Sequence, residues 1–296
     1  MRTDIAFDAA GTTLRGWLYV PANASGPCPA VVMAHGLSAL KEMGLDDYAE
    51  VFVAAGLAVL VYDNRNLGAS DGTPRDEIDP VAQRRDYGHA ITFAQSRPEI
   101  DPQRIGIWGT SYTGGLVLMA AALDRRVKAV VSQVPYISAF ESTQKAMSAE
   151  ARIEYRKMLE QDRWERASGA ASRIVTVCED DPEKPGDTTT RMSHRYFDHY
   201  VRTRGAPWPN RLTVNSLDLR QEYEAMPWMP RISPTPLLMI VAEEDRITAT
   251  DIALRAFYAA REPKELLVIP GDHYIPYLDR FADSSGAARD FFVRHL

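Results

Sequence analysis

One short segment of the sequence limits the folds that this chain can adopt. The apolar run at residues 105–108 stops at Gly109, a single serine follows at Ser111, and a run of small residues with helical character begins almost at once. This order puts one hydroxyl group on a sharp turn between a strand and a helix, beside the free N–H groups of the helix start. A serine there can attack a carbonyl carbon while those N–H groups stabilise the developing oxyanion. The segment therefore predicts a strand–turn–helix unit that carries a nucleophilic serine.

Two other interpretations of Ser111 need to be weighed. A serine at a strand–helix junction can serve only as the N-cap of the helix. A protein of this kind can also keep a binding pocket without catalysing a reaction. Partner residues elsewhere in the chain, described below, favour the nucleophile over both.

The same strand–helix order repeats along the chain, after an N-terminal hairpin formed by residues 5–8 and 14–20. The expected strands are at 30–34, 57–62, 104–108, 127–134, 236–242 and 266–270, and the expected helices are at 45–55, 81–96, 114–123, 250–260 and 282–295. Strands that alternate with helices are typical of a mostly parallel sheet with helices on both faces. The fold class is therefore α/β, with a mostly parallel central sheet flanked by helices.

This order breaks after Pro135. Residues 136–231 contain helix-like pieces rich in charged and aromatic residues, with a polar loop at 179–187. The strand–helix order then resumes. We therefore predict a core made of residues 1–135 and 232–296, interrupted by a mainly helical lid insertion at 136–231.

Three reactive side chains follow strands of the predicted sheet. Ser111 follows one strand, Asp245 comes just after residues 236–242, and His273 comes just after residues 266–270. In an open parallel sheet, functional groups gather outside the carboxyl ends of the strands. Serine, then acid, then histidine is also the chain order of the α/β-hydrolase triad. We predict Ser111 as the nucleophile, His273 as its base and Asp245 as the group that orients the imidazole.

The remaining parts of such a site also have candidates. The backbone N–H groups of Tyr112 and Leu37 are expected to form the oxyanion hole. The neighbouring carboxylates Glu243 and Glu244 leave the identity of the acid open. His35, the alternative base, is more simply explained as a residue that packs beside the oxyanion turn.

Two further acidic residues have mainly structural interpretations. Asp272 precedes His273 and is either a turn residue or a competitor for the acid role. Asp63 and Arg65 lie in a turn-rich loop after a buried strand, and one interpretation is that the two pair and brace the loop near the catalytic end. A purely structural turn is the favoured interpretation of the loop.

These features together resemble the α/β-hydrolase superfamily. The matching segments are His35-Gly36, Asp63-x-Arg65-x-x-Gly68-x-Ser70, Gly109-x-Ser111, Asp245 and His273. Within the superfamily, residues 41–45 and 233–238 make the chain similar to the dienelactone-hydrolase-like group that includes fungal polyketide transferases. The resemblance implies an α/β-hydrolase fold with a lid between core strands.

The segment around Ser111 departs from the usual pentapeptide at one position. Thr113 stands where glycine is usual, and Gly114 comes one place later. This form is similar to that of the X-Pro dipeptidyl-peptidase and cocaine-esterase group. That group also carries a large C-terminal β-domain, which the few residues after His273 cannot form, so peptidase activity is not the leading expectation.

The composition argues against several classes of binding partner and cofactor. The net charge is −6 and only two cysteines occur, without zinc-ligand spacing. We therefore expect no nucleic acid or membrane partner, no metal and no organic cofactor. The first ten residues have no apolar stretch typical of a signal peptide, so a cytoplasmic location is expected. The oligomeric state, including a homo-oligomer, stays open.

The expected activity is that of a serine hydrolase. Its substrate would be an ester, lactone or thioester of a fairly apolar small molecule, uncharged rather than highly charged. Met158, Trp164 and Trp228 of the insertion are candidates for the pocket, because methionine and flat aromatic rings suit apolar surfaces. An acyl or polyketide transferase using the same serine is the main alternative, and a C–C hydrolase or peptidase is a further variant.

Overall fold

An eight-stranded sheet forms the centre of the structure, which is a computed structural model that describes residues 1–178 and 188–296. The polar loop expected at 179–187 lies outside the described residues. The strand order is β1-β2-β4-β3-β5-β6-β9-β10. The bounds are β1 Arg2–Ala9, β2 Thr12–Tyr19, β3 Cys28–Ala34, β4 Ala58–Tyr62, β5 Ile100–Thr110, β6 Val127–Gln133, β9 Leu237–Ala242 and β10 Lys264–Ile269.

The sheet is mostly parallel, as the sequence predicts. The N-terminal hairpin β1–β2 is antiparallel, and β2 pairs antiparallel with β4. All other neighbours, from β4 to β10, pair in parallel. The carboxyl ends of β5, β9 and β10 therefore open toward the same end of the sheet, which is where the reactive side chains were expected.

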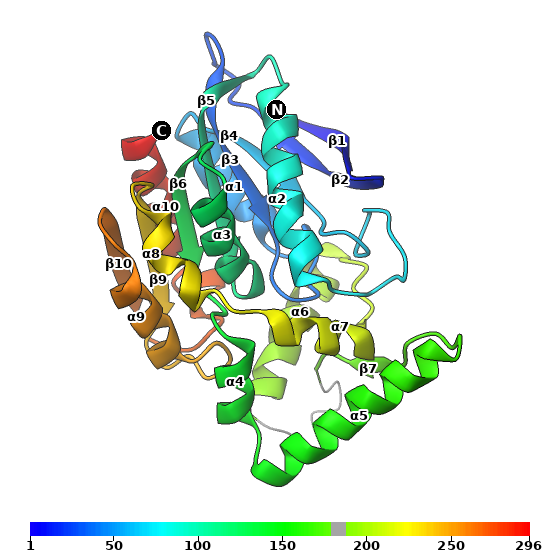
Figure 1. Ribbon diagram of the computed structural model, residues 1–296. Helices are drawn as coiled ribbons and strands as arrows, with labels where there is room; N and C mark the ends of the chain where they lie inside the picture. Colours follow the sequence, from blue (N-terminus) through cyan, green and yellow to red (C-terminus); the bar gives the residue numbers. More distant parts are fainter. Residues whose placement is uncertain (179–187) are drawn as a thin grey trace.

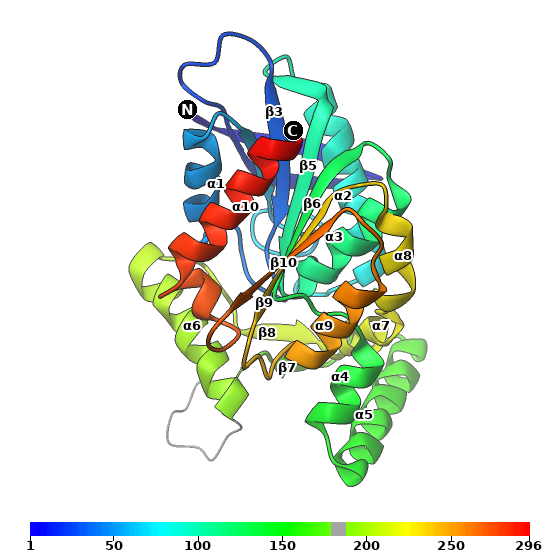
Figure 2. The same cartoon turned by 90° about the vertical axis from the view of Figure 1, so that its left-hand side faces the viewer.

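Helices cover both faces of the sheet (Figures 1 and 2). One face carries α1 and α10, which contact each other, and the other carries α2, α3, α8 and α9. Their bounds are α1 Leu45–Ala54, α2 Pro80–Gln95, α3 Tyr112–Leu123, α8 Met229–Ile232, α9 Thr250–Ala259 and α10 Phe281–His295. Every residue of β4 and β9 is buried, because a strand covered on both faces meets no solvent on either side.

Apart from α8, the segment between β6 and β9 lies beyond the carboxyl ends of the strands in both views (Figures 1 and 2). It is mainly helical. Its elements before α8 are α4 Ala139–Ala146, α5 Ala149–Ala167, β7 Ile174–Thr176, α6 Thr188–Arg204, β8 Arg211–Thr213, α7 Val214–Leu219, η1 Arg220–Glu222 and η2 Met226–Trp228. The short antiparallel pair β7–β8 was not expected from the sequence. Among the described residues, no helix combines the length and apolar character that crossing a membrane requires.

Candidate active site

Ser111 lies on a sharp turn between β5 and α3. Its backbone has φ 54° and ψ −117°, a strained conformation for a residue with a side chain. Two backbone hydrogen bonds hold it there: its N–H donates to the carbonyl of Gln133 at 2.9 Å, and its carbonyl accepts from Tyr136 N–H at 2.8 Å. The side chain forms no capping hydrogen bond with α3. The hydroxyl group therefore does not act as an N-cap and projects from the turn.

Close packing around this turn explains both its glycine and its threonine. A Cβ atom at Gly109 would lie 2.3 Å from the carbonyl oxygen of Thr113, so no side chain fits there. The Thr113 hydroxyl is fully buried, accepts from Thr110 N–H at 3.0 Å and donates to the Ala34 carbonyl at 2.9 Å. Thr113 therefore ties the turn to the end of β3, which a glycine at this position cannot do.

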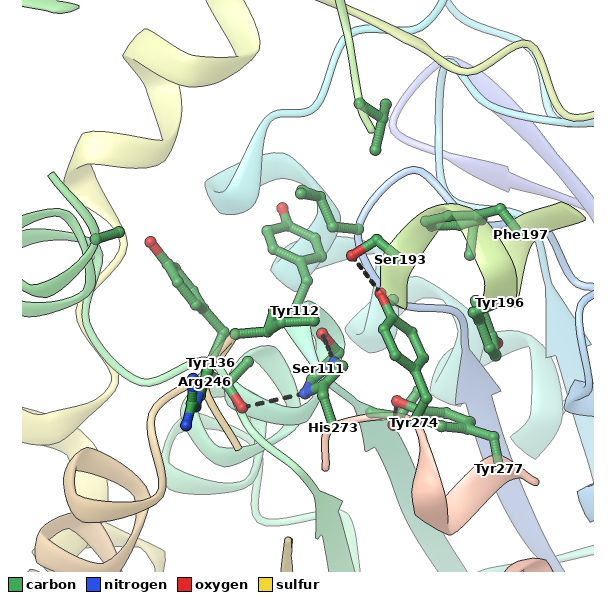
Figure 3. Close-up of a pocket in the computed structure, with 18 of the residues that line it drawn as sticks. Ser111, Tyr112, Tyr136, Ser193, Tyr196, Phe197, Arg246, His273, Tyr274 and Tyr277 are labelled. Atoms are coloured by element: carbon green, nitrogen blue, oxygen red, sulfur yellow. Dashed lines mark hydrogen bonds between the residues drawn. The ribbon is translucent and has the colours of Figure 1, made fainter. Parts of the chain in front are cut away.

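The side chains of Ser111, His273 and Asp245 form one hydrogen-bonded chain. His273 Nε2 lies 3.0 Å from Ser111 Oγ, and His273 Nδ1 lies 2.7 Å from Asp245 Oδ2. Figure 3 shows the first of these contacts at the floor of a cavity. His273 and Asp245 are buried, whereas Ser111 is partly exposed. The structure thus brings together the three residues that the sequence placed at the ends of three strands.

The Asp245 carboxylate accepts several hydrogen bonds from its own loop. Its Oδ1 accepts the N–H groups of Ile247 at 2.8 Å and Thr248 at 2.9 Å, and its Oδ2 accepts the Thr248 hydroxyl at 2.7 Å. Burial alone would raise the pKa of the Asp245 carboxyl. The charge and hydrogen bond of His273, together with the bonds from Thr248, outweigh burial and lower this pKa. Asp245 is therefore ionised at neutral pH.

The other candidate acids lie elsewhere. Glu243 and Glu244 are exposed. Asp272 accepts the Tyr274 N–H at 2.8 Å and so serves its own turn. Of the four carboxylates in this region, Asp245 is the one that contacts His273.

His35 has a structural role. Its Nε2 accepts the Asn64 N–H at 3.1 Å, and its Nδ1 lies 2.9 Å from the Gly36 carbonyl oxygen. Burial is the main reason that its pKa is lowered, although the nearby Asp63 opposes the shift. Both ring nitrogens are engaged in these contacts, so His35 is not a base for Ser111.

Leu37 and Tyr112, whose backbone N–H groups are expected to form the oxyanion hole, line the same cavity as Ser111. Tyr112 is the first residue of α3, and Leu37 lies on the loop after β3. Neither N–H donates to another group among the residues that the structure describes. A Cβ at Gly36 would lie 3.3 Å from the Ser111 Cβ, so glycine lets this loop approach the serine closely.

The cavity has a volume of about 470 Å³ and is lined by both the core and the segment between β6 and β9. Tyr274 and Tyr277, which follow His273, were not identified from the sequence. Tyr196 and Phe197 belong to the aromatic-rich residues 136–231, but the sequence did not single them out as pocket residues. All four line the cavity because α6 packs against the loop after His273: the Tyr274 hydroxyl donates to Ser193 Oγ at 2.8 Å.

The residues predicted for the pocket lie outside it. Met158, Trp164 and Trp228 are not among the residues that line the cavity. Trp164 is 70% exposed on α5, and the Trp228 ring packs under the Arg231 guanidinium, 5.0 Å from the ring centroid. The prediction was wrong because helical spacing identifies a face of a helix but not what that face meets.

The alternative interpretation, in which Asp63 and Arg65 pair with each other, does not hold. Asp63 instead accepts from Lys41 Nζ at 2.7 Å and from Lys41 N–H at 2.8 Å. Arg65 pairs with the buried Asp86 of α2. Both contacts brace the loop after β4, so the loop is structural as favoured, but its partners come from other elements. Among the described residues, no cluster of three or more histidine, cysteine and acidic side chains could hold a metal ion.

Several known proteins are similar to this chain in sequence and in fold. The thiohydrolase of Eupenicillium brefeldianum is 33% identical over 276 residues, which cover 90% of this chain and 85% of that protein. The polyketide transferase grgF of Penicillium sp is 31% identical over 299 residues, which cover 100% and 97%. The crystal structure of the α/β hydrolase GrgF from Penicillium sp. sh18 superposes with a TM-score of 0.84 at 29% identity, covering 100% of this chain and 99% of that one.

These similarities agree with the expected resemblance to α/β hydrolases and to polyketide transferases. They extend over nearly the whole chain, so both the core and the segment between β6 and β9 have counterparts in the relatives. The sequence pattern of the X-Pro dipeptidyl-peptidase (S15) family matches residues 10–275, which include Ser111, Asp245 and His273. The chain belongs to the X-Pro dipeptidyl-peptidase (S15) family of α/β hydrolases.

Proposed function

We propose that the protein is a serine hydrolase that cleaves an ester, lactone or thioester of a fairly apolar small molecule. Ser111, His273 and Asp245 are its catalytic triad. The observation that carries this proposal is the pair of contacts made by His273, at 3.0 Å to Ser111 Oγ and at 2.7 Å to Asp245 Oδ2. Ser111 as the nucleophile, His273 as its base and Asp245 as the group that orients the base are connected in the way that acyl transfer requires.

The first half of the reaction forms an acyl-enzyme. His273 Nε2 takes the proton of the Ser111 hydroxyl while Oγ attacks the carbonyl carbon of the substrate. The negative charge that develops on the carbonyl oxygen is stabilised by the N–H groups of Leu37 and Tyr112. The tetrahedral intermediate then expels the alcohol or thiol, which receives the proton from His273. Asp245 stabilises the imidazolium between the two proton transfers.

The second half releases the acid. A water molecule gives a proton to His273 Nε2 and its oxygen attacks the acyl carbon. The bond to Ser111 Oγ breaks, Oγ takes the proton back, and the carboxylic acid leaves. We propose that residues 136–231 act as a lid during these steps, because Tyr136, Tyr196 and Phe197 from this segment line the cavity.

A thioester is the form of substrate that we favour. A relative from Eupenicillium brefeldianum that is named a thiohydrolase shares 33% identity over 90% of this chain, and we take that name as support for cleavage of a bond to sulfur. Family membership alone does not identify a substrate, because one fold supports many reactions.

The decisive experiment compares Ser111→Ala with the wild type across p-nitrophenyl esters of graded chain length, lactones and thioesters. We expect the variant to keep its circular dichroism spectrum and to lose several orders of magnitude in kcat/KM. Ser25→Ala, in an exposed loop remote from the cavity, is the matched control and should behave as the wild type. A fluorophosphonate probe should label the wild type and not Ser111→Ala. Equal turnover by Ser111→Ala and wild type would rule the proposal out.

Acyl transfer is the second candidate. It is supported by the polyketide transferase grgF, which is 31% identical over the whole of this chain. Both reactions share the acyl-enzyme and differ only in whether water or another acceptor attacks it. Adding an alcohol or amine acceptor to the thioester assay distinguishes them: a transferase forms more transfer product than acid at millimolar acceptor, whereas a hydrolase releases acid throughout.

A further inference from the structure

The cavity above Ser111 has two chemically different sides (Figure 3). On one side of Ser111 and His273 lie the aromatic rings of Tyr196, Phe197, Tyr274 and Tyr277, as the figure shows. The rings of Tyr196 and Tyr274 are stacked, with centroids 4.7 Å apart and planes 24° apart. This aromatic side offers a flat apolar surface for the carbon chain of a substrate.

The other side is positively charged. Tyr136 and Arg246 lie there in Figure 3, and Lys145 and Arg220 also line the cavity. Among the residues that the structure describes, no aspartate or glutamate lines the cavity. The positive charge of Lys145 is paired with a carboxylate outside the cavity, because Lys145 Nζ donates to Asp251 at 2.8 Å. Of the two arginines, Arg220 is partly buried and Arg246 is exposed at the cavity.

Arg220 and Arg246 have no carboxylate partner among the described residues. Arginines nearby are paired: Arg163 with Asp218, Arg211 with Asp76 and Arg255 with Glu141. Arg220 is partly buried, and its electrostatic neighbours are Tyr136, Tyr155 and Tyr112. Its guanidinium lies 5.8 Å from the centroid of the Tyr136 ring.

A guanidinium withdrawn from water without an opposite charge is costly. An aromatic neighbour recovers only part of that cost through cation–π attraction. A bound anion recovers more, because a carboxylate or phosphate oxygen accepts the two parallel N–H groups of an arginine.

We propose that the substrate of this site carries one anionic oxygen group, a carboxylate or a phosphate, bound by Arg220 and Arg246. The apolar part of the same molecule packs on the Tyr196, Phe197, Tyr274 and Tyr277 rings, which leaves the scissile carbonyl at Ser111. The inference rests on the proposed function, since it assigns a substrate class to that same site. It replaces the expectation from the sequence that uncharged substrates are preferred.

Two matched pairs of substrates test whether an anionic group is preferred. They also show whether that group belongs to the acyl chain or to the leaving group. The first pair is p-nitrophenyl hexanoate and the p-nitrophenyl monoester of adipic acid, which differ by a carboxylate on the acyl chain. The second pair is S-hexanoyl-2-mercaptoethanol and its O-phosphate, which differ by a phosphate on the leaving group. The wild type should prefer the anionic member of one pair by about tenfold or more in kcat/KM, as a charge-assisted hydrogen bond allows.

Arginine variants connect that preference to the site. In Arg220→Gln and Arg246→Gln, the ratio between anionic and neutral members should fall toward one. Arg202→Gln is the control, because the Arg202 side chain is 77% exposed on α6 and does not line the cavity. Arg246 is itself exposed, so Arg246→Gln should fold even if the loss of Arg220 destabilises the protein. No preference in either pair, or a preference that persists in the double variant, overturns the proposal.

A binding measurement separates this proposal from the proposed function. Calorimetry on Ser111→Ala compares monomethyl adipate with methyl hexanoate, and S-hexanoyl-2-mercaptoethanol phosphate with its neutral partner. If the wild type hydrolyses none of the substrates but Ser111→Ala binds an anionic member at least tenfold more tightly, the anion site stands and the proposed hydrolysis fails. If hydrolysis depends on Ser111 while binding shows no preference for the anion, the anion site fails alone.

Discussion

The indole Nε1 of Trp208 donates a hydrogen bond to the carbonyl oxygen of Ser38 at 3.0 Å. Ser38 has φ 53° and directly follows Leu37, whose N–H is one of the two proposed oxyanion donors. The Trp208 ring is stacked on Phe197 of α6, with centroids 4.1 Å apart and planes 4° apart. A residue of the segment between β6 and β9 therefore contacts the strained loop that carries Leu37.

Replacing Trp208 with phenylalanine keeps an aromatic ring against Phe197 and removes the donor. We expect Trp208→Phe to lower kcat about tenfold with little change in KM, because an oxyanion donor acts mainly in the transition state. Deleting such a donor outright costs about 10²–10³ in kcat, and a loosened loop should cost less. Trp164→Phe, at a 70% exposed position on α5, is the control and should match the wild type. An effect on KM alone would contradict this role for Trp208.

Asp245→Asn should lower kcat by about 10³–10⁴ while the fold is kept. The amide cannot stabilise the imidazolium, and its NH₂ group favours the wrong tautomer of His273. Glu243→Gln and Glu244→Gln should each stay close to wild-type kcat, because these side chains are exposed and do not contact His273. Steady-state kinetics on one thioester would decide, and a larger loss in either glutamate variant would reassign the acid.

The buried His35 should make stability depend on pH. Burial lowers its pKa in the folded state below the ordinary 6.5, so below about pH 6.5 the unfolded chain binds a proton that the folded protein does not. The free energy of unfolding should therefore fall as the pH drops from 7.5 to 5.5. His35→Gln keeps an acceptor for the Asn64 N–H but does not titrate, so its free energy of unfolding should fall less.

Urea unfolding of wild type and His35→Gln at both pH values measures this difference. The comparison at pH 7.5, where His35 is neutral in both states, serves as the reference for any effect of the substitution itself. Parallel pH dependence in the two proteins would show that His35 does not contribute.

Thr113 should stabilise the turn through its hydroxyl. Thr113→Val keeps the shape of the side chain but leaves the buried Thr110 N–H without an acceptor, and we expect a loss of about 1–3 kcal/mol in the free energy of unfolding. Thr113→Ser keeps the hydroxyl and should lose less. Urea unfolding curves of the two variants test the difference, and equal stabilities would mean that packing rather than hydrogen bonding matters at this position.

The sequence alone was enough to predict the strand–helix order, the turn at Ser111 and the three side chains of the proposed triad. These depend on local periodicity and on the rule that parallel strands end at the same edge of the sheet. The N-terminal hairpin followed from the same local patterns and is present as β1–β2. The sequence also showed that Thr113 replaces the usual glycine after the serine. It did not show the reason, which is the pair of hydrogen bonds made by the Thr113 hydroxyl.

The tertiary structure decided which neighbours each residue meets. The sequence favoured Asp245 but left Glu243 and Glu244 open as the acid, and the contacts of Asp245 with Thr248 and His273 distinguish it from them. Asp63 and Arg65 pair with residues of other elements and not with each other. The cavity is lined by rings near His273 and on α6 in place of Met158, Trp164 and Trp228. Periodicity records which face of an element is apolar or charged, whereas the partner of that face is set by packing between segments distant in the chain.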